Sequence, residues 1–168
     1  MQQRLGYLQE LGVGALWITP IYEQTGPYNA SEQCGYHGYW AENFMKVDRH
    51  LGTLQDYQQL SHRIHSAGMY LVQDIVVNHT ANFFSYSGGH QAQKARNAPD
   101  PAQNFALNAG TRPLHAPTQW PFSMNDARNP EHRRAGIYHW TPAISDYTDT
   151  KQEMNFQMGG LDDLNTEN

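Results

Sequence analysis

Two compact apolar runs constrain the fold of this 168-residue chain more than any other feature. Residues 13–19 (VGALWIT) and 69–77 (MYLVQDIVV) are apolar along most of their length, which is typical of strands buried on both faces. Apolar residues at helical spacing precede each run, over residues 5–11 and 54–67. The order helix, strand, helix, strand predicts an α/β fold with a parallel sheet.

The second predicted helix has the clearer boundaries. Thr53 and Asp56 form the pattern of a capping box, and Gly68 ends the helix. His62 and His65 fall on its polar side, where a solvated face is a better interpretation than a metal site because no third ligand completes the pattern.

The remaining chain has weak periodicity and divides into two stretches. Residues 20–50 are rich in Gly, Pro, Tyr, Asn and His, and we predict a long loop of the kind that compact domains keep for function. From about residue 80 to 160, prolines interrupt most candidate helices. This change predicts an irregular, β-leaning subdomain inserted after the second strand.

The composition excludes several classes of function. The formal net charge is −5 and only 16% of residues are charged, so the basic footprint of a nucleic-acid partner is missing. No apolar run reaches about 18 residues and the first residues lack a signal-peptide core, so we expect neither a membrane partner nor targeting from this chain. The single Cys34 excludes an intrachain disulfide and a multi-cysteine zinc site.

Candidate site residues lie where the predicted strands end, since α/β folds bind ligands beyond the carboxyl ends of their strands. Asn78 and His79 directly follow the second run, and a hydrogen-bonded strand-end cap is the alternative interpretation. Residues 35–40 (GYHGYW) gather three rings and an imidazole around two glycines, which suits a pyranose, although core packing would explain the rings equally well. Asp74 lies within the second run and needs a cation or hydrogen-bond donors.

Five segments make the pattern specific: LGVGALWITPIYE, GYHGYWAENF, LGTLQDYQQL, AGMYLVQDIVVNHT and GGLDDLNTEN. In this order they resemble the α-amylase family of glycoside hydrolases. Residues 74–79 resemble its Asp-x-x-x-Asn-His region on the third barrel strand, and residues 161–165 its short region near the end of the B domain. The resemblance implies a partial (β/α)8 TIM barrel over residues 1–79, with an irregular, β-leaning B domain over residues 80–168 that is inserted after the third strand and ends just before the fourth.

The resemblance also implies an activity, the retaining hydrolysis of α-1,4-glucans such as starch and maltodextrins. The family's three catalytic carboxylates follow later strands, and no residue here matches them, so we expect an inactive fragment that covers the second and third βα units and the B domain. A cyclodextrin-degrading, debranching or transglycosylating member, or a non-catalytic glucan-binding relative, stays open. The family favours an extracellular or periplasmic location and needs no organic cofactor, and the oligomeric state stays open.

By resemblance, Tyr39 stacks on the sugar whose bond is cut, while His37, Trp40 and His79 bind that sugar or its neighbour. Asp74 has an orienting role. We therefore expect Tyr39 and His79 to lie close together at one rim of a cleft. A zinc hydrolase is disfavoured because His37 and His79 lack a pair of histidines four residues apart with a glutamate.

Asn78 and Asp163 match positions that bind calcium in many family members. They would tie the B domain to the barrel through oxygen ligands of the kind that Ca²⁺ prefers. Two ligands do not complete a site, because Ca²⁺ takes six to eight oxygens. We expect the two residues to approach each other despite their distance in the sequence.

Overall fold

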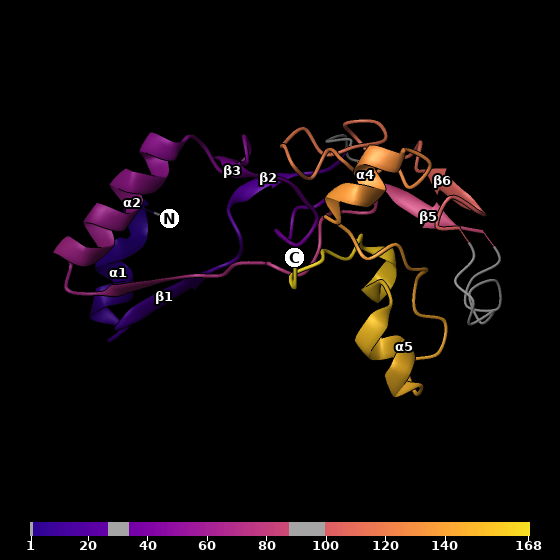
Figure 1. Cartoon of the computed structure of the whole chain (residues 1–168). Helices are drawn as coiled ribbons and strands as arrows, with labels where there is room; N and C mark the ends of the chain where they lie inside the picture. The colour runs from indigo at the N-terminus through magenta and orange to yellow at the C-terminus, as the bar shows by residue number, and fades with distance from the viewer. Residues whose placement is uncertain (1, 27–33, 88–99) are drawn as a thin grey trace.

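The computed structural model describes residues 2–26, 34–87 and 100–168 (Figure 1). Its elements, in chain order, are η1 (Gln2–Arg4), α1 (Leu5–Glu10), β1 (Ala15–Ile18), β2 (Tyr22–Gln24), β3 (Ala41–Val47), α2 (Leu54–Ser66), β4 (Tyr70–Gln73), β5 (Phe84–Tyr86), β6 (Phe105–Leu107), α4 (Pro130–Ala135), α5 (Thr150–Asn155) and η2 (Met158–Gly160). The strands of the described residues form three two-stranded sheets. None of the described helices is long enough to span a bilayer.

The helix–strand–helix–strand order predicted from the sequence is confirmed in the N-terminal part. β1 and β4 pair in parallel, from Ala15 opposite Tyr70 to Ile18 opposite Gln73. The predicted capping box begins α2: the Thr53 side chain accepts from the Asp56 amide, and the Asp56 carboxylate accepts from the Thr53 amide.

One face of the β1–β4 sheet packs on the helices. Leu5 of α1, Ile64 of α2 and Met69, which immediately precedes β4, form the buried cluster on this side. Burial of these three side chains holds α1, α2 and the sheet together. The sheet therefore has one well-covered face.

The prediction that both strands are buried on both faces is wrong for this chain. Side chains along β1 and β4 alternate between half-buried and exposed. Trp17 is 75% exposed and Tyr70 is 74% exposed on the uncovered face. The reason is that only two parallel strands pair within the described residues, so the barrel is not closed and no further strand or helix covers this face.

The second strand is also shorter than predicted, since β4 ends at Gln73. Asp74 still donates its amide to the Ile18 carbonyl at 3.1 Å, which extends the ladder by one bond. Pro20 then follows β1 and has no amide hydrogen to offer. The chain leaves the sheet at Asp74, which therefore lies just beyond the strand and not within it.

Residues 20–50 contain an antiparallel hairpin in addition to loops, so the prediction of one long loop is wrong here. β2 and β3 pair from Tyr22 opposite Val47 to Gln24 opposite Ala41, with two register shifts between them. Such irregularities break the two-residue alternation that reveals a strand in a sequence. The Tyr22 hydroxyl accepts the Val76 amide at 2.7 Å and ties the hairpin to the chain that follows β4.

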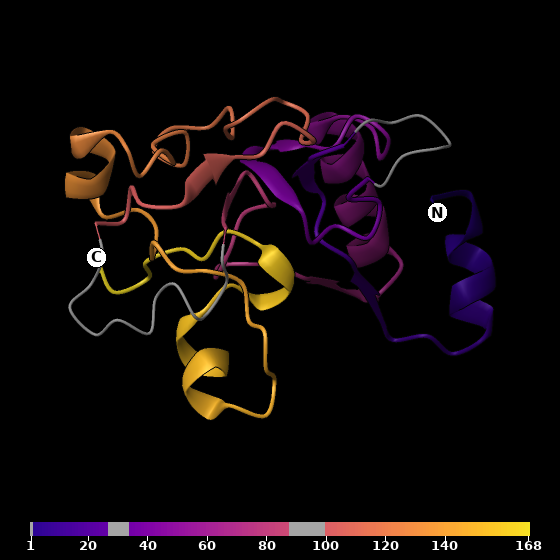
Figure 2. The same cartoon turned by 90° about the vertical axis from the view of Figure 1, so that its right-hand side faces the viewer.

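The C-terminal part is irregular, as predicted. β5 and β6 form a short antiparallel pair, and an aromatic cluster packs beside it. The cluster is built around Phe84, Phe105 and Tyr138. α4 and α5 lie apart from each other in both views (Figures 1 and 2). A domain boundary at residue 80 stays a prediction.

Asp162 holds the end of the chain against the segment that leaves β4. Its carbonyl accepts the Thr80 amide at 3.0 Å, and its fully buried carboxyl group accepts the amides of Phe83 and Phe84 at 2.9 and 3.3 Å. Burial raises the pKa of this carboxyl group well above its usual value. These bonds place residues 162–164 beside the predicted site residues Asn78 and His79.

Candidate functional site

The loop formed by residues 35–40 owes its shape to two glycines. Gly38 has φ +94°, and a Cβ atom there would lie 2.7 Å from the Pro20 carbonyl oxygen. A Cβ atom at Gly35 would lie 2.8 Å from the Gln24 side chain. The Gly38 amide donates to the Gly35 carbonyl at 2.8 Å and closes the turn. Larger residues at these two positions would push the loop away from the chain between β1 and β2.

His37 lies at the centre of the rings in this loop. Its imidazole stacks on Tyr39 with centroids 5.8 Å apart and meets Trp40 edge-on at 4.9 Å. The Tyr39 amide donates to His37 Nδ1 at 3.0 Å, so Nδ1 is an acceptor and the proton of the neutral ring lies on Nε2. Burial lowers the pKa of His37, which favours this neutral form.

The Tyr39 side chain is anchored by Asp74. The Tyr39 hydroxyl donates to Asp74 Oδ2 at 2.6 Å, across 35 residues of sequence. This bond raises the pKa of Tyr39 because it stabilises the protonated phenol. Asp74 itself is fixed by the hydrogen bond that its main-chain amide donates to the Ile18 carbonyl at the end of the sheet. The predicted orienting residue thus contacts the predicted stacking residue directly.

His79 contacts the same tyrosine through the main chain. His79 Nε2 lies 3.1 Å from the Tyr39 carbonyl oxygen, which can only accept, so Nε2 carries a proton. Burial lowers the pKa of His79, although the bond to Tyr39 and the Asp163 carboxylate oppose that shift. In the neutral ring, Nδ1 is then an acceptor. Tyr39 and His79 lie close together, as the sequence predicted; their role in binding stays a prediction.

Asn78 and Asp163 come together through the backbone. His79 and Asp163 form an antiparallel bridge, and the Leu164 amide donates to the Asn78 carbonyl at 2.7 Å. Asp163 Oδ2 contacts His139 Nδ1 at 2.7 Å, a partner that the sequence did not reveal. In the part of the chain that the structure describes, no three His, Cys, Asp or Glu side chains are grouped to hold a metal ion. Asn78 and Asp163 therefore offer at most part of a calcium shell.

Gln24, like His139, is a residue of this region that the sequence did not identify. It is buried, and its Oε1 accepts the Trp40 amide at 2.7 Å while its Nε2 donates to the Tyr22 carbonyl at 2.9 Å. The amide thus connects the hairpin to the aromatic loop. No local sequence signal marks such a contact, because it spans 16 residues and uses a side chain without ionisable chemistry.

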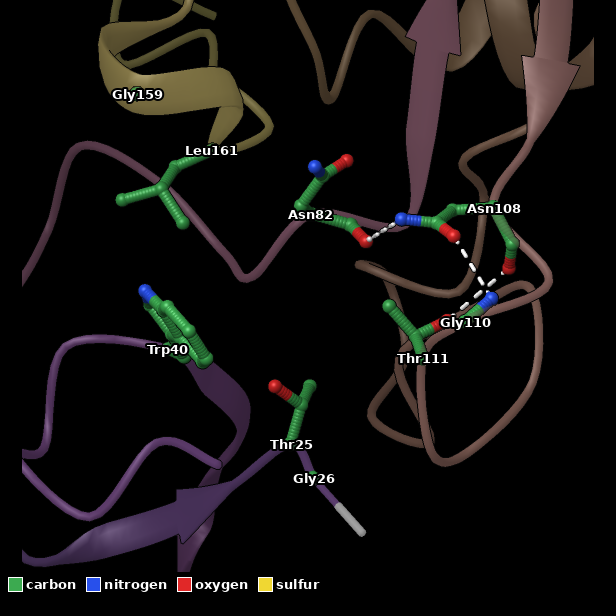
Figure 3. Close-up of a pocket in the computed structure, with 9 residues that line it drawn as sticks. All are labelled: Thr25, Gly26, Trp40, Asn82, Asn108, Gly110, Thr111, Gly159 and Leu161. Atoms are coloured by element: carbon green, nitrogen blue, oxygen red, sulfur yellow. Dashed lines mark hydrogen bonds between the residues drawn. The ribbon is translucent and has the colours of Figure 1, made fainter. Parts of the chain in front are cut away.

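Trp40 lies between the aromatic loop and a neighbouring cavity. The Trp40 carbonyl accepts the Thr25 amide at 2.9 Å, which places Trp40 at the end of β2. Its indole ring lines a cavity of about 270 Å³ between the hairpin and the C-terminal part (Figure 3). The predicted residues Tyr39, His37, Trp40, His79 and Asp74 therefore belong to one connected region at the end of the parallel strands.

Comparison with known proteins gives this region its context. The family model described as the alpha amylase catalytic domain matches residues 1–168. The chain is 32% identical to a cyclomaltodextrin glucanotransferase of Klebsiella oxytoca over 98% of its length, and 31% identical to a beta/alpha-amylase of Paenibacillus polymyxa over the same share. It superposes on a crystal structure of alpha-amylase from Geobacillus thermoleovorans, complexed with acarbose, with a TM-score of 0.62 and 27% identity over 99% of the chain.

The chain belongs to the alpha-amylase family of glycoside hydrolases. It spans only part of its relatives: 22% of the Klebsiella protein, 10% of the Paenibacillus protein and 26% of the Geobacillus structure. The incomplete α/β fold agrees with this partial coverage.

Proposed function

We propose that this chain forms the non-catalytic part of the substrate site of a retaining hydrolase acting on α-1,4-glucans. The observation that carries the proposal is the attachment of Tyr39 to both Asp74 and His79, in a chain that belongs to the alpha-amylase family. Asp74 and His79 lie at the carboxyl end of β4, the end at which parallel α/β folds bind ligands.

The chemistry of these residues suits a neutral sugar. The Tyr39 ring is exposed and offers an apolar face, while its hydroxyl is already bonded to Asp74. Neutral His37 and His79 each keep one ring nitrogen for sugar hydroxyls, Nε2 as a donor in the first and Nδ1 as an acceptor in the second. The acarbose complex of the Geobacillus relative supports this ligand class.

Bond cleavage requires groups that we do not assign to this chain. Retaining glycosidases use two carboxyl groups about 5–5.5 Å apart, one as nucleophile and one as acid and base. We further propose that none of the family's catalytic carboxylates lies in these 168 residues, so that the chain alone is inactive. Their contribution to catalysis is to hold the sugar, which is useful where the contacts strengthen in the transition state.

Transglycosylation is the second candidate reaction. The specific observation in its favour is the match to the Klebsiella cyclomaltodextrin glucanotransferase, which covers 98% of this chain. Hydrolysis and transfer would share Tyr39, His37 and His79, since both reactions hold the same donor sugar. They differ in whether water or another sugar accepts the glycosyl group.

We also propose that Asn78 and Asp163 contribute ligands to a calcium ion. Support comes from the bridge that brings them to the same junction and from the oxygen chemistry of both side chains. His139 would compete with the ion for Asp163 Oδ2. A calcium ion bound there would cross-link the segment after β4 to residues 162–164.

The proposed function is tested on the protein expressed from its complete reading frame. Soluble starch is the substrate, and NMR reports the anomer at each new reducing end; a retaining hydrolase releases the α-anomer first. Tyr39→Ala should lower kcat/KM roughly tenfold or more, because the stacking face is lost. Tyr7→Ala, an exposed tyrosine on α1, is the matched control. Release of the β-anomer, or equal activity of both variants, would contradict the proposal.

A further inference from the structure

Asp162 is a buried acid to which the proposed function gives no role. Its side chain is fully buried, and within the described residues neither a lysine nor an arginine forms an ion pair with it. Its carboxyl oxygens accept two main-chain amides, Oδ2 that of Phe83 and Oδ1 that of Phe84. Burying a carboxyl group without a cation costs free energy. Its presence at this point therefore needs a physical explanation.

The two amides explain the choice of side chain. Phe83 and Phe84 are themselves fully buried, so water does not reach their amides. A buried amide without an acceptor is costly, and an apolar residue at position 162 would leave two of them. The Asp162 carboxyl group supplies both acceptors at once, across 79 and 78 residues of sequence. It thus fixes two distant parts of the chain relative to each other.

The main chain around Asp162 clamps the segment that follows β4. The Asp162 carbonyl accepts the Thr80 amide at 3.0 Å, and the Asp162 amide donates to the Ala81 carbonyl at 3.4 Å. One residue further along, Asp163 forms the antiparallel bridge with His79. Three consecutive residues after β4 are therefore held by Asp162 and its neighbour.

The same segment also contacts the aromatic loop and the start of β3. His79 Nε2 donates to the Tyr39 carbonyl at 3.1 Å, and the Ala81 amide donates to the Ala41 carbonyl at 2.9 Å. Ala81 therefore bonds Asp162 through its carbonyl and β3 through its amide. Ala41 and Ala81 are both buried, so this contact is closed to solvent. A displacement of the segment would reach Tyr39 directly.

We infer that Asp162 is a positioning residue of the substrate site, whose carboxyl group sets the segment after β4 so that His79 keeps its bond to Tyr39. The inference rests on the proposed function and deepens it, because it names a residue that holds the sugar-binding pair in place. Since Asp162 is fully buried, it acts on a glucan only through His79. Loss of its carboxyl group should weaken glucan binding in a protein that is still folded.

A second fastening at this junction does not depend on the carboxyl group. In the orientation that satisfies its neighbours, the Asn82 side chain donates to the Phe84 carbonyl at 3.0 Å and to the Gly160 carbonyl at 3.3 Å. Asp162→Asn also keeps one acceptor oxygen for the amide of Phe83 or Phe84. We therefore expect this variant to fold with His79 displaced.

The first test observes His79 in the protein expressed from its complete reading frame. With ¹⁵N-labelled histidine, NMR should detect the His79 Nε2 proton, because its bond to Tyr39 slows exchange with water, and His79→Ala assigns the signal. In Asp162→Asn this proton should exchange about 10-fold faster or more. Asp149→Asn makes the same chemical change at the cap of α5 and should leave the signal unaltered. Unaltered exchange in Asp162→Asn would overturn the inference, whatever becomes of the proposed function.

The second test separates positioning from a general loss of structure. Thio-linked maltotetraose resists hydrolysis, and calorimetry gives its Kd for Asp162→Asn, His79→Ala and the double variant. Asp162→Asn should weaken binding about 3- to 10-fold when His79 is present, and have no effect in the His79→Ala background. Equal weakening in both backgrounds would overturn the inference, since Asp162 would then act on the site without His79.

Failure of this inference is distinguishable from failure of the proposed function. If His79→Ala weakens the tetrasaccharide and Asp162→Asn does not, the positioning role is overturned and the proposed function stands. If His79→Ala leaves binding unchanged, the binding role of His79 is overturned, and the positioning role with it. Should Asp162→Asn not fold, Asp162→Ser, which keeps a smaller acceptor, replaces it in both measurements with the same expected results.

Discussion

The aromatic loop of residues 35–40 and the β1–β4 sheet differ in what stabilises them. The loop is held by contacts within this chain, from Gln24, Asp74 and His79. Within the described residues, the sheet has helices on one face only, and its other face exposes Trp17 and Tyr70. The candidate binding residues are therefore held by contacts that this chain supplies itself, whereas the sheet beneath them depends on cover that the described residues do not supply.

The largest expected effect concerns the sheet. We expect the 168 residues expressed alone to be insoluble or to unfold without cooperativity, because two apolar strands leave a face and edges open to association. Calorimetry and sedimentation would measure this, and a reducing-sugar assay on starch should show no release. The same residues within their complete reading frame should be soluble and active. Cooperative unfolding together with glucan hydrolysis by the isolated chain would mean that catalytic residues have been missed, and Asp74 would be the first to re-examine.

The junction between the segment after β4 and residues 162–164 should respond to calcium. If Asn78 and Asp163 contribute ligands, saturating Ca²⁺ at about 100 times its Kd should add about 2.7 kcal/mol to the free energy of unfolding of the complete protein. Asp163→Asn should remove most of that gain. Mg²⁺ is the control ion, because it is smaller and demands stricter octahedral geometry. A melting temperature indifferent to Ca²⁺ would rule out the proposed site.

A smaller effect should appear in the loop when pH falls. Burial lowers the pKa of His37 and of His79 below the ordinary value of 6.5, so the unfolded state binds more protons in acid. Their contribution to stability is therefore present above about pH 6.5 and is lost as the pH falls below it. Denaturant unfolding at pH 5, 6 and 8 would measure how the free energy of unfolding changes with pH.

His37→Asn gives the matched comparison for this pH effect. The substituted amide offers an oxygen to the Tyr39 main-chain amide but does not titrate, so the fall in stability between pH 8 and pH 5 should be smaller. At pH 8 the His37 and His79 imidazoles are neutral, which makes that pH an internal reference. An unchanged slope in this variant would show that His37 does not carry the effect.

The elements of the fold that depend on local sequence were predictable, and those that depend on long-range pairing were less so. The Thr53–Asp56 box identified the start of α2, and apolar runs located β1 and β4. The β2–β3 hairpin escaped because its register shifts remove the alternation of side chains. The exposure of Trp17 could not be foreseen, since burial depends on what packs against a strand and not on its own residues.

For the candidate site, resemblance to the family supplied residue identities and the structure supplied their connections. The bond from the Tyr39 hydroxyl to Asp74 spans 35 residues, and the Asp163 contact with His139 spans 24. No spacing rule anticipates such pairs.

The most direct test of the account is whether Asp74 acts on substrate through the Tyr39 hydroxyl. Tyr39→Phe, Asp74→Ala and the double variant are compared in the complete protein by the Kd for thio-linked maltotetraose and by KM against kcat. We predict that Asp74→Ala weakens binding about 3- to 10-fold when Tyr39 is present, and far less when the Tyr39→Phe substitution has already removed the hydroxyl. If the factors by which the two single substitutions weaken binding simply multiply in the double variant, Asp74 and Tyr39 act independently. That result would contradict the proposed action of Asp74 through Tyr39.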